Sequence, residues 1–298
     1  MNITLTGSLG NINKELIGKL TSAGHQVKVI SHSPERATAI EALQATPLIG
    51  SVTDAAFVSA AFAGADAVYL MTPPNVSTAD VKGYIKATGQ IYADAIDANG
   101  VGRVINLSSI GAHKADGLGP TGANYAVEHL LNNLEGVDVL HLRPGLFYSN
   151  FYGSIPVIKY QGIMGNNFDA DVTVALTDPA DIAAAIANTL NAPAFSGKKV
   201  EYVVSDLKTG GAIAAILGEA IGIPHLPWIA FPDEVLLPEL LKSGMSAEMA
   251  NVYIIEIGIA LRNNSLLEDY YRHREEAAGG TKFEEFAKTF AYAYATTS

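Results

Sequence analysis

The sequence predicts an α/β fold in which a doubly wound parallel sheet is followed by a smaller, mainly helical C-terminal substrate domain. Six short apolar segments alternate with helical segments over residues 1–150, and helices dominate from residue 209 onward. Helical connections of this length form right-handed crossovers, which make the strands parallel and cover both faces of the sheet. The length of 298 residues agrees with about two structural units.

The elements of the first unit follow from apolar periodicity and from turn residues. Ser33 and Pro34 form a favourable N-cap and first-turn pair for the second helix, and Pro73 and Pro74 end the fourth strand. The predicted strands are NITLTG, QVKVIS, 47–50, ADAVYLM, RVINLSS and VDVLHLRPG, and the helices between them span about 13–23, 34–45, 54–63, 77–99 and 124–134.

The alternation loosens after Gly145, and this change sets the predicted domain boundary. Residues 1–150 form the dinucleotide-binding domain, completed by the Ala-rich helix and the KVEYVVS strand within about 172–205. Residues 151–171 and 206–298 form the smaller lobe. Because no low-complexity linker separates them, the two units should pack tightly on each other.

Composition excludes several classes of function. Nineteen basic and 30 acidic residues give a net charge of −11, which repels phosphate backbones and argues against direct nucleic-acid binding. Without cysteine there is no thiolate nucleophile, and no His, Asp or Glu cluster has metal-ligand spacing, so we expect no metal. No apolar run could span a bilayer and no signal segment opens the chain, so we expect a cytoplasmic protein that does not bind membranes.

The turn GSLGNIN carries the strongest functional signal. Gly7 and Gly10 lie where the first strand enters the first helix, so that backbone N–H groups and the helix dipole can meet a dinucleotide pyrophosphate. Asn13 occupies the position where a third glycine is usual. The alternative is a tight turn without a ligand.

The end of the second strand bears on the choice of cofactor. An enzyme that prefers NAD typically has an acidic side chain there, whereas this chain has Ser31, His32 and Ser33, followed by Arg36. Arg36 could pair with a 2′-phosphate, which favours NADP(H) over NAD(H). The alternative is that Arg36 is a solvated helix residue and His32 a surface loop residue.

Six motifs in this order resemble the NmrA-like branch of atypical short-chain dehydrogenases: GSLGNIN, SHSPER, GADAVYLMTPP, VINLSSIGA, NYAVEHLL and LRPGLFYSN. The resemblance runs from residue 1 to about 275 and implies a Rossmann domain that binds NAD(P) with a small C-terminal substrate domain. Members of this family include quinone and triphenylmethane reductases, and redox-sensing regulators that bind the cofactor without turnover.

The resemblance also implies a set of cofactor-binding positions. His32 and Arg36 stand where relatives place cations, and Tyr148 and Asn150 belong to a segment that closes over cofactor and substrate. The residues implied to contact the cofactor are Gly7, Ser8, Leu9, Gly10, Asn11 and Ile12 at the pyrophosphate, Ser31, His32 and Arg36 at the ribose, Met71, Thr72 and Pro73 along the dinucleotide, and Ser108, Ser109, Pro144 and Phe147 near the nicotinamide.

The Tyr-x-x-x-Lys pair of the wider superfamily is missing. NYAVEH offers Tyr125 with His129 four residues later, and we take these two as the candidate catalytic pair; the alternative is that they only pack on each other. If Glu128 is aligned with the lysine, the tyrosine position becomes Asn124. A reaction that needs only hydride delivery to a strong acceptor would survive this loss.

Two hypotheses for function follow. The first is an NADPH-dependent reductase of a small planar acceptor such as a quinone, with a substrate pocket built from Tyr148, Asn150, Phe151 and Trp228. The Trp228 segment could equally be a plug between the domains. The second is a non-catalytic NAD(P)-sensing regulator that binds a protein partner. The aromatic helix near the C-terminus could dock on its own domain or on a second copy, which would make a homodimer.

Overall fold

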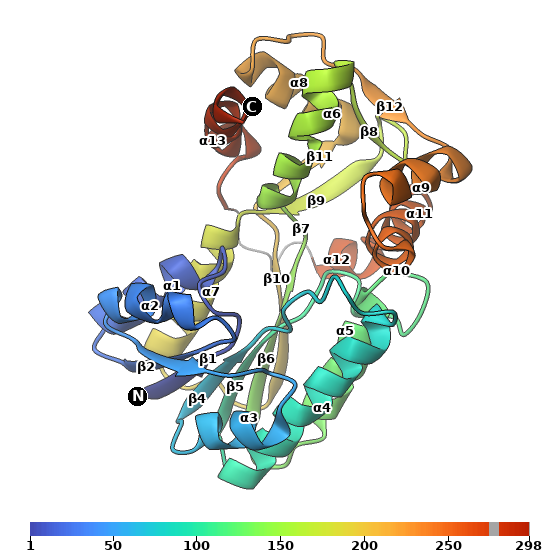
Figure 1. Ribbon diagram of the computed structural model, residues 1–298. Coiled ribbons are helices and arrows are strands. Elements are labelled where there is room, and N and C mark those ends of the chain that lie inside the picture. Colours follow the sequence, from blue (N-terminus) through green and yellow to red (C-terminus); the bar gives the residue numbers. More distant parts are fainter. Residues whose placement is uncertain (274–279, 298) are drawn as a thin grey trace.

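The computed structural model describes residues 1–273 and 280–297 and has two lobes (Figure 1). The larger lobe contains a seven-stranded sheet in the order β10-β6-β5-β4-β1-β2-β3, and every neighbouring pair is parallel. The direction of winding reverses between β1 and β4, where dinucleotides bind in folds of this kind. The strands are β1 (Asn2–Leu5), β2 (Gln26–Ser31), β3 (Thr46–Ile49), β4 (Ala67–Leu70), β5 (Arg103–Leu107), β6 (Asp138–Pro144) and β10 (Lys198–Val203). The predicted doubly wound fold is confirmed.

Helices cover both faces of this sheet because each presents an apolar stripe to it. One face packs on α1, α2 and α7, and the other packs on α3, α4 and α5. The central strand β4 is buried along its whole length between these layers. The helices are α1 (Asn13–Ser22), α2 (Ala37–Ala42), α3 (Ala55–Phe62), α4 (Val81–Asn99), α5 (Thr121–Asn132) and α7 (Pro179–Asn191).

Capping explains where the structure departs from the expected helix boundaries. Ser33 does not cap the second helix, because its hydroxyl donates to the carboxylate of Glu35. The chain there forms the 3₁₀ turn η1 (Pro34–Arg36) before the short helix α2, instead of one helix over 34–45. Helix α4 begins at residue 81 because the carboxylate of Asp80 accepts a hydrogen bond from the Gly83 N–H at 2.7 Å.

The smaller lobe combines helices with two small sheets (Figure 1). Within the segment expected to complete the large domain, α7 and β10 join the seven-stranded sheet, but β9 joins a second sheet of order β11-β9-β7. Strand β8 pairs with β12 in the third sheet. The strands are β7 (Leu146–Phe147), β8 (Met164–Asn166), β9 (Thr173–Thr177), β11 (Asp206–Thr209) and β12 (Trp228–Ala230).

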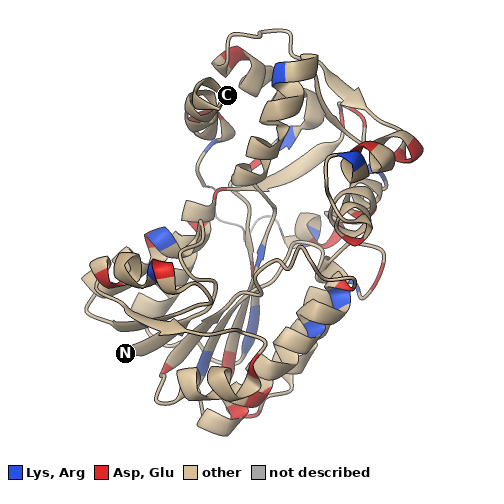
Figure 2. Ribbon diagram, in the orientation of Figure 1, with Lys and Arg blue, Asp and Glu red and all other residues tan. Residues whose placement is uncertain are grey.

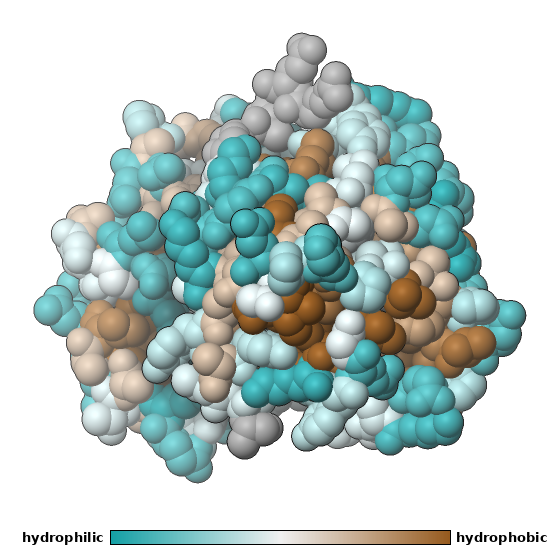
Figure 3. Space-filling model, turned by 90° about the horizontal axis from the view of Figure 1, so that it is seen from above, coloured by the Kyte–Doolittle hydropathy of each residue, from teal (hydrophilic) through white to brown (hydrophobic). Residues whose placement is uncertain are grey.

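Most of the remaining chain in this lobe is helical, as the sequence predicted. Seen from above, hydrophobic residues gather near the middle of the lobe's outer face, within a hydrophilic rim (Figure 3). The helical elements are η2 (Tyr148–Ser154), α6 (Ile155–Gln161), α8 (Gly210–Ala220), α9 (Asp233–Lys242), α10 (Ala247–Ala250), the π-helical turn η3 (Asn251–Ile255), α11 (Glu256–Arg262), α12 (Glu268–His273) and α13 (Phe283–Thr296).

The C-terminal helix α13 docks on its own lobe. Phe283, Phe286 and Phe290 are buried, and the first two of these rings contact Tyr148 at centroid distances of 5.1 and 5.4 Å. These contacts account for the apolar face of the helix without a second copy of the chain. No helix within residues 1–273 and 280–297 is both long and apolar enough to cross a bilayer.

Candidate cofactor and substrate site

The glycine turn lies at the C-terminal end of β1, at the switch point of the sheet. Gly7 has a φ of +91°, and a Cβ there would lie 2.7 Å from Met71 Cε, so the position requires glycine. The Thr6 hydroxyl donates to the carbonyl oxygen of Met71 at 2.8 Å and accepts from the Met71 N–H at 2.6 Å. These bonds fix the turn against the end of β4.

Asn13, in place of the usual third glycine, holds the turn from the helix side. Its buried amide nitrogen donates to the carbonyl oxygens of Thr6 and Ser8, both at 2.7 Å. A glycine would allow the helix to approach the strand, whereas here the asparagine side chain fills the space and links the two. The substitution therefore replaces close packing with hydrogen bonds and keeps the turn in place.

The turn has the donors that a pyrophosphate needs. Helix α1 begins at Asn13, and in the part of the chain that the structure describes the N–H groups of Leu9, Asn11 and Ile12 have no hydrogen-bond acceptor. The positive end of the helix dipole adds to the attraction for an anion. Since Gly7 leaves room for close approach, the residues present fit a dinucleotide.

Arg36 reaches back to the glycine turn from η1. Its Nη1 donates to Ser8 Oγ at 3.3 Å, and Ser8 Oγ donates to Ser31 Oγ at 2.8 Å. The guanidinium therefore stands beside two hydroxyl groups at the end of β2, where the adenosine ribose lies in folds of this kind. His32 is exposed next to this group and makes no contact with it. The arrangement is compatible with a phosphate on the ribose.

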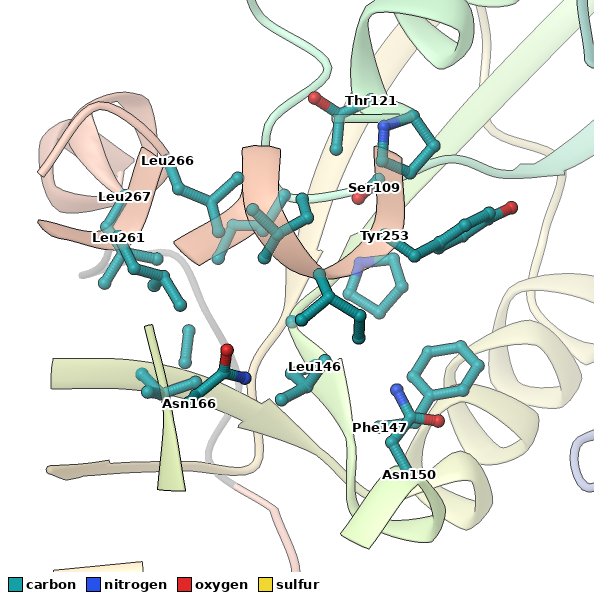
Figure 4. Close-up of a pocket in the computed structure, with 18 of the residues that line it drawn as sticks. Ser109, Thr121, Leu146, Phe147, Asn150, Asn166, Tyr253, Leu261, Leu266 and Leu267 are labelled. Carbon is teal, nitrogen blue, oxygen red and sulfur yellow. The ribbon is translucent and has the colours of Figure 1, made fainter. Parts of the chain in front are cut away.

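A cavity of about 610 Å³ opens from the carboxyl ends of β4, β5 and β6 into the junction of the two lobes (Figure 4). Among the described residues that line it, none is an Asp, Glu, Lys, Arg or His. Figure 2 places several basic residues on strands of the large sheet, but none of these lines the cavity. The cavity can therefore hold an apolar ligand without paying for an unpaired charge.

The structure brings together most of the residues predicted near the nicotinamide and the substrate. The predicted residues that line the cavity are Met71, Thr72, Ser108, Ser109, Pro144, Phe147, Asn150, Phe151 and Trp228. Asn11 also joins the glycine turn to the segment after β6, because its Nδ2 donates to Ser149 Oγ at 3.3 Å. The turn, the strand ends and the cavity thus form one continuous site.

Two predicted residues lie elsewhere. Tyr148, expected in the substrate pocket, is buried in the aromatic cluster with Phe283, and its hydroxyl donates to the Thr281 carbonyl oxygen at 2.6 Å. The first turn of η2 directs this side chain toward α13, while Phe151 faces the cavity. Pro73 lies just beyond the cavity, whose wall ends at Thr72.

The candidate catalytic pair does not reach the cavity. Tyr125 and His129 stack on each other at 4.0 Å on the outer side of α5, and neither lines the cavity. The same helix turns Asn124 toward the cavity and Glu128 into the protein. Of the two possible alignments, the one that puts Asn124 at the tyrosine position and Glu128 at the lysine position is the one whose first residue lines the cavity.

Sequence reasoning missed one wall of the cavity. The spacing of Tyr253, Ile254, Ile257 and Leu261 is that of a buried helix face, which by itself indicates core packing, yet all four line the cavity. They follow one another through η3 and α11, and a π-helical turn shifts the facing of successive side chains. Such a turn leaves no clear mark in the sequence. Burial raises the pKa of the Tyr253 phenol, so it stays protonated at neutral pH.

Comparison with known proteins agrees with this geometry. The profile of a family described as NAD(P)H-binding matches residues 7–193, which include the glycine turn and five strands of the large sheet. The chain belongs to the NAD(P)H-binding family. No curated protein sequence matches the chain.

Solved structures of several other proteins share the whole fold. An NADPH-dependent quinone oxidoreductase from Escherichia coli, complexed with NADPH, superposes with a TM-score of 0.80 at 21% identity, covering 96% of this chain and 99% of the other. Triphenylmethane reductase from Citrobacter sp., complexed with NADP(H), gives 0.79 at 19% identity over 97% and 99%. A nucleoside-diphosphate-sugar epimerase from Staphylococcus aureus gives 0.77 at 15% identity over 97% and 100%. The family match and these neighbours confirm the resemblance to NmrA-like proteins.

Proposed function

We propose that this protein is an NADPH-dependent reductase of a small, planar, uncharged acceptor such as a quinone. The observation that carries the proposal is the cavity lined without a charged side chain, which begins at Met71 and Thr72 and continues past Ser108 and Ser109. An acceptor in this cavity would lie against the strand ends where the nicotinamide lies in folds of this kind.

The reaction requires the protein mainly to position the acceptor against the cofactor. The bound cofactor supplies a hydride, and together with one proton from water this reduces a quinone to a hydroquinone while NADPH becomes NADP⁺. The apolar walls around Phe147, Ile254 and Ile257 exclude water and hold the acceptor ring. No carboxylate or imidazole is needed to complete such a reaction.

Asn124 and Tyr253 are the side chains we assign to the acceptor oxygens. The Asn124 amide lines the cavity and has no hydrogen-bond partner among residues 1–273 and 280–297. The Tyr253 phenol, with its raised pKa, can donate but does not ionise near neutral pH. Both groups could donate hydrogen bonds to an oxygen on which negative charge develops during reduction.

The preference for NADPH rests on Arg36. Its guanidinium lies beside Ser8 and Ser31, at 3.3 Å from the Ser8 hydroxyl, and the first acidic side chain after β2 is Glu35, whose carboxylate accepts from the Ser33 hydroxyl. A 2′-phosphate could replace the hydroxyl as the acceptor of the arginine donor and form a charge-assisted bond.

The cavity lining disfavours a nucleotide-sugar substrate. A nucleoside diphosphate sugar carries two negative charges on its diphosphate, and no Lys or Arg of the described chain lines the cavity to neutralise them. A non-catalytic NAD(P)-sensing regulator is the second candidate, because Tyr125 and His129 both lie outside the cavity. The open volume of about 610 Å³ favours the reductase.

The test is consumption of NADPH with a panel of uncharged quinones. We expect turnover by the wild-type protein and none by Gly10→Glu, which introduces a carboxylate where the pyrophosphate lies. Gly102→Glu is the matched control, since an added Cβ at this exposed position meets nothing within 4 Å. Tight NADPH binding without turnover of any quinone would leave the sensing regulator as the function.

A further inference from the structure

The cavity has two ends of different character. In Figure 4, Ser109, Phe147 and Asn150 lie toward the strand ends, whereas Leu261, Leu266 and Leu267 gather on the opposite side. The first end is the one we assign to the nicotinamide and the acceptor ring. The second end extends away from it, between α11, α12 and the small sheets, and needs an occupant of its own.

The far end is an apolar chamber, which we define by Leu261, Leu266, Leu267, Met164, Phe168 and Trp228. The three leucines are 2–6% exposed and come from the end of α11 and the turn that leads to α12. Met164 and Phe168 are buried in the same apolar cluster as the leucines.

Most polar atoms at this end already have partners, whereas the Asn166 amide nitrogen has none among residues 1–273 and 280–297. The Trp228 indole N–H donates to the Phe168 carbonyl oxygen at 2.9 Å, which fixes the indole at 5.0 Å from the Phe168 ring. Asn166 lies near the leucines, and its side-chain oxygen accepts from the Asn167 N–H at 2.8 Å. The chamber thus offers mainly apolar contact surface.

We propose that the chamber binds an apolar substituent of the acceptor, of the class of alkyl or isoprenoid chains. This inference rests on the proposed reductase function and narrows its substrate to a ring that carries such a chain. A bare ring would leave the chamber to water with few unpaired polar groups to bind it, and a chain would release that water. Each buried methylene should raise kcat/KM about three- to fourfold until the chamber is full.

The kinetic test compares quinones with the same ring and with chains of zero, three and six carbons. We expect kcat/KM to rise at least tenfold along the series, mainly through a lower KM. The double variant Leu266→Phe, Leu267→Phe narrows the chamber and should remove this rise, so that the ratio of kcat/KM between the six-carbon and the unsubstituted quinone falls toward one. Leu241→Phe is the matched control, because Leu241 is 42% exposed and lies outside the cavity.

A second measurement does not depend on turnover or on a folded variant. Trp228 is the single tryptophan of the chain, so its fluorescence reports on the chamber directly. We titrate the wild-type protein with a redox-inert hydroquinone dimethyl ether carrying a six-carbon chain, and with the same ether lacking the chain. A saturable change that is at least tenfold tighter for the ether with the chain supports the chamber.

The outcomes separate the two proposals. Turnover of every quinone at the same kcat/KM, with no preference of Trp228 for the chain-bearing ether, would overturn the chamber and leave the reductase standing. Absence of any NADPH oxidation, together with a chain-dependent fluorescence change, would remove the reductase and retain an apolar ligand site.

Discussion

The carboxylate of Glu128 and the guanidinium of Arg143 form a buried ion pair with an N–O distance of 2.7 Å, directly behind the cavity. Glu128 also accepts from the Ser108 hydroxyl, and Arg143 also donates to Asp269 Oδ2 at 3.1 Å. The pair therefore ties β5, β6, α5 and α12 together beneath the residues assigned to the nicotinamide. A lysine at position 128 would lie against the positively charged Arg143 guanidinium and not beside a tyrosine.

Breaking this pair should destabilise the fold. We expect Glu128→Gln to lower the free energy of unfolding by about 3 kcal/mol, because Arg143 would stay buried with only part of its compensation. Glu128→Lys should lower the free energy of unfolding further, because it places a second positive charge beside Arg143. The measurement is urea unfolding, and the exposed Glu135→Gln should stay within about 0.5 kcal/mol of wild type. A loss for Glu128→Gln no greater than for Glu135→Gln would contradict the role of the pair.

Asn167 and Gly258 should be coupled in shaping the cavity wall. The Asn167 amide donates to the Ile255 carbonyl oxygen of η3 at 3.1 Å, and a Cβ at position 258 would lie 1.6 Å from Asn167 Oδ1. We expect Gly258→Ala to cost about 1–3 kcal/mol of stability and to raise KM for the acceptor, because it displaces η3.

A double-mutant cycle checks this coupling. Asn167→Ala removes the clash, so the double variant should recover part of the loss, with a coupling energy of about 0.5–3 kcal/mol. Gly18→Ala in α1 is the control, since an added Cβ there meets nothing within 4 Å. Additive effects of the two substitutions on stability would show that Asn167 is not the reason why position 258 requires glycine.

Arg36 should discriminate between the two cofactors. We expect Arg36→Ala to raise the Kd for NADPH about 10- to 100-fold, the value of one or two hydrogen bonds to a charged group, and to leave the Kd for NADH within about twofold. Calorimetric titration measures both constants. Lys19→Ala, an exposed charge change at the far end of α1, controls for long-range electrostatics. An equal rise in Kd for both cofactors would show that Arg36 does not contact the 2′-phosphate.

His141 should make stability depend on acidity. Burial lowers its pKa from 6.5 to about 4, and its two ring nitrogens contact Asn106 Nδ2 at 3.1 Å and Asn132 Oδ1 at 3.0 Å, which suits the neutral ring. Between these pKa values the unfolded chain binds the extra proton. Stability from this residue is therefore complete above pH 6.5 and falls as the pH drops toward 4, by up to about 3 kcal/mol.

The check is the slope of unfolding free energy against pH in wild type and in His141→Gln. The variant should lose this contribution to the slope between pH 6.5 and 4, whatever its absolute stability. His225→Gln, at an exposed position, should keep the wild-type slope. Parallel curves for wild type and His141→Gln would show that His141 does not titrate with a lowered pKa.

The large sheet and the cofactor turn follow from local features of the chain. Strand, turn and helix periods are local properties, so GSLGNIN at the first strand-helix junction was enough to predict where Gly7 and Gly10 lie. Because parallel strands end at one edge of a sheet, the positions of Met71, Ser108 and Pro144 near the cavity also followed from the order of the strands.

The substrate end of the site depends instead on long-range packing. Its wall joins Asn124 of α5, Trp228 of β12 and the turn that carries Tyr253, which are far apart in the sequence and have no local signal for meeting. The helical period alone does not predict that Tyr125 and His129 face outward, or that the Glu128 carboxylate pairs with Arg143. Which face of a helix is buried depends on the partner that covers it, and that partner is set by long-range packing.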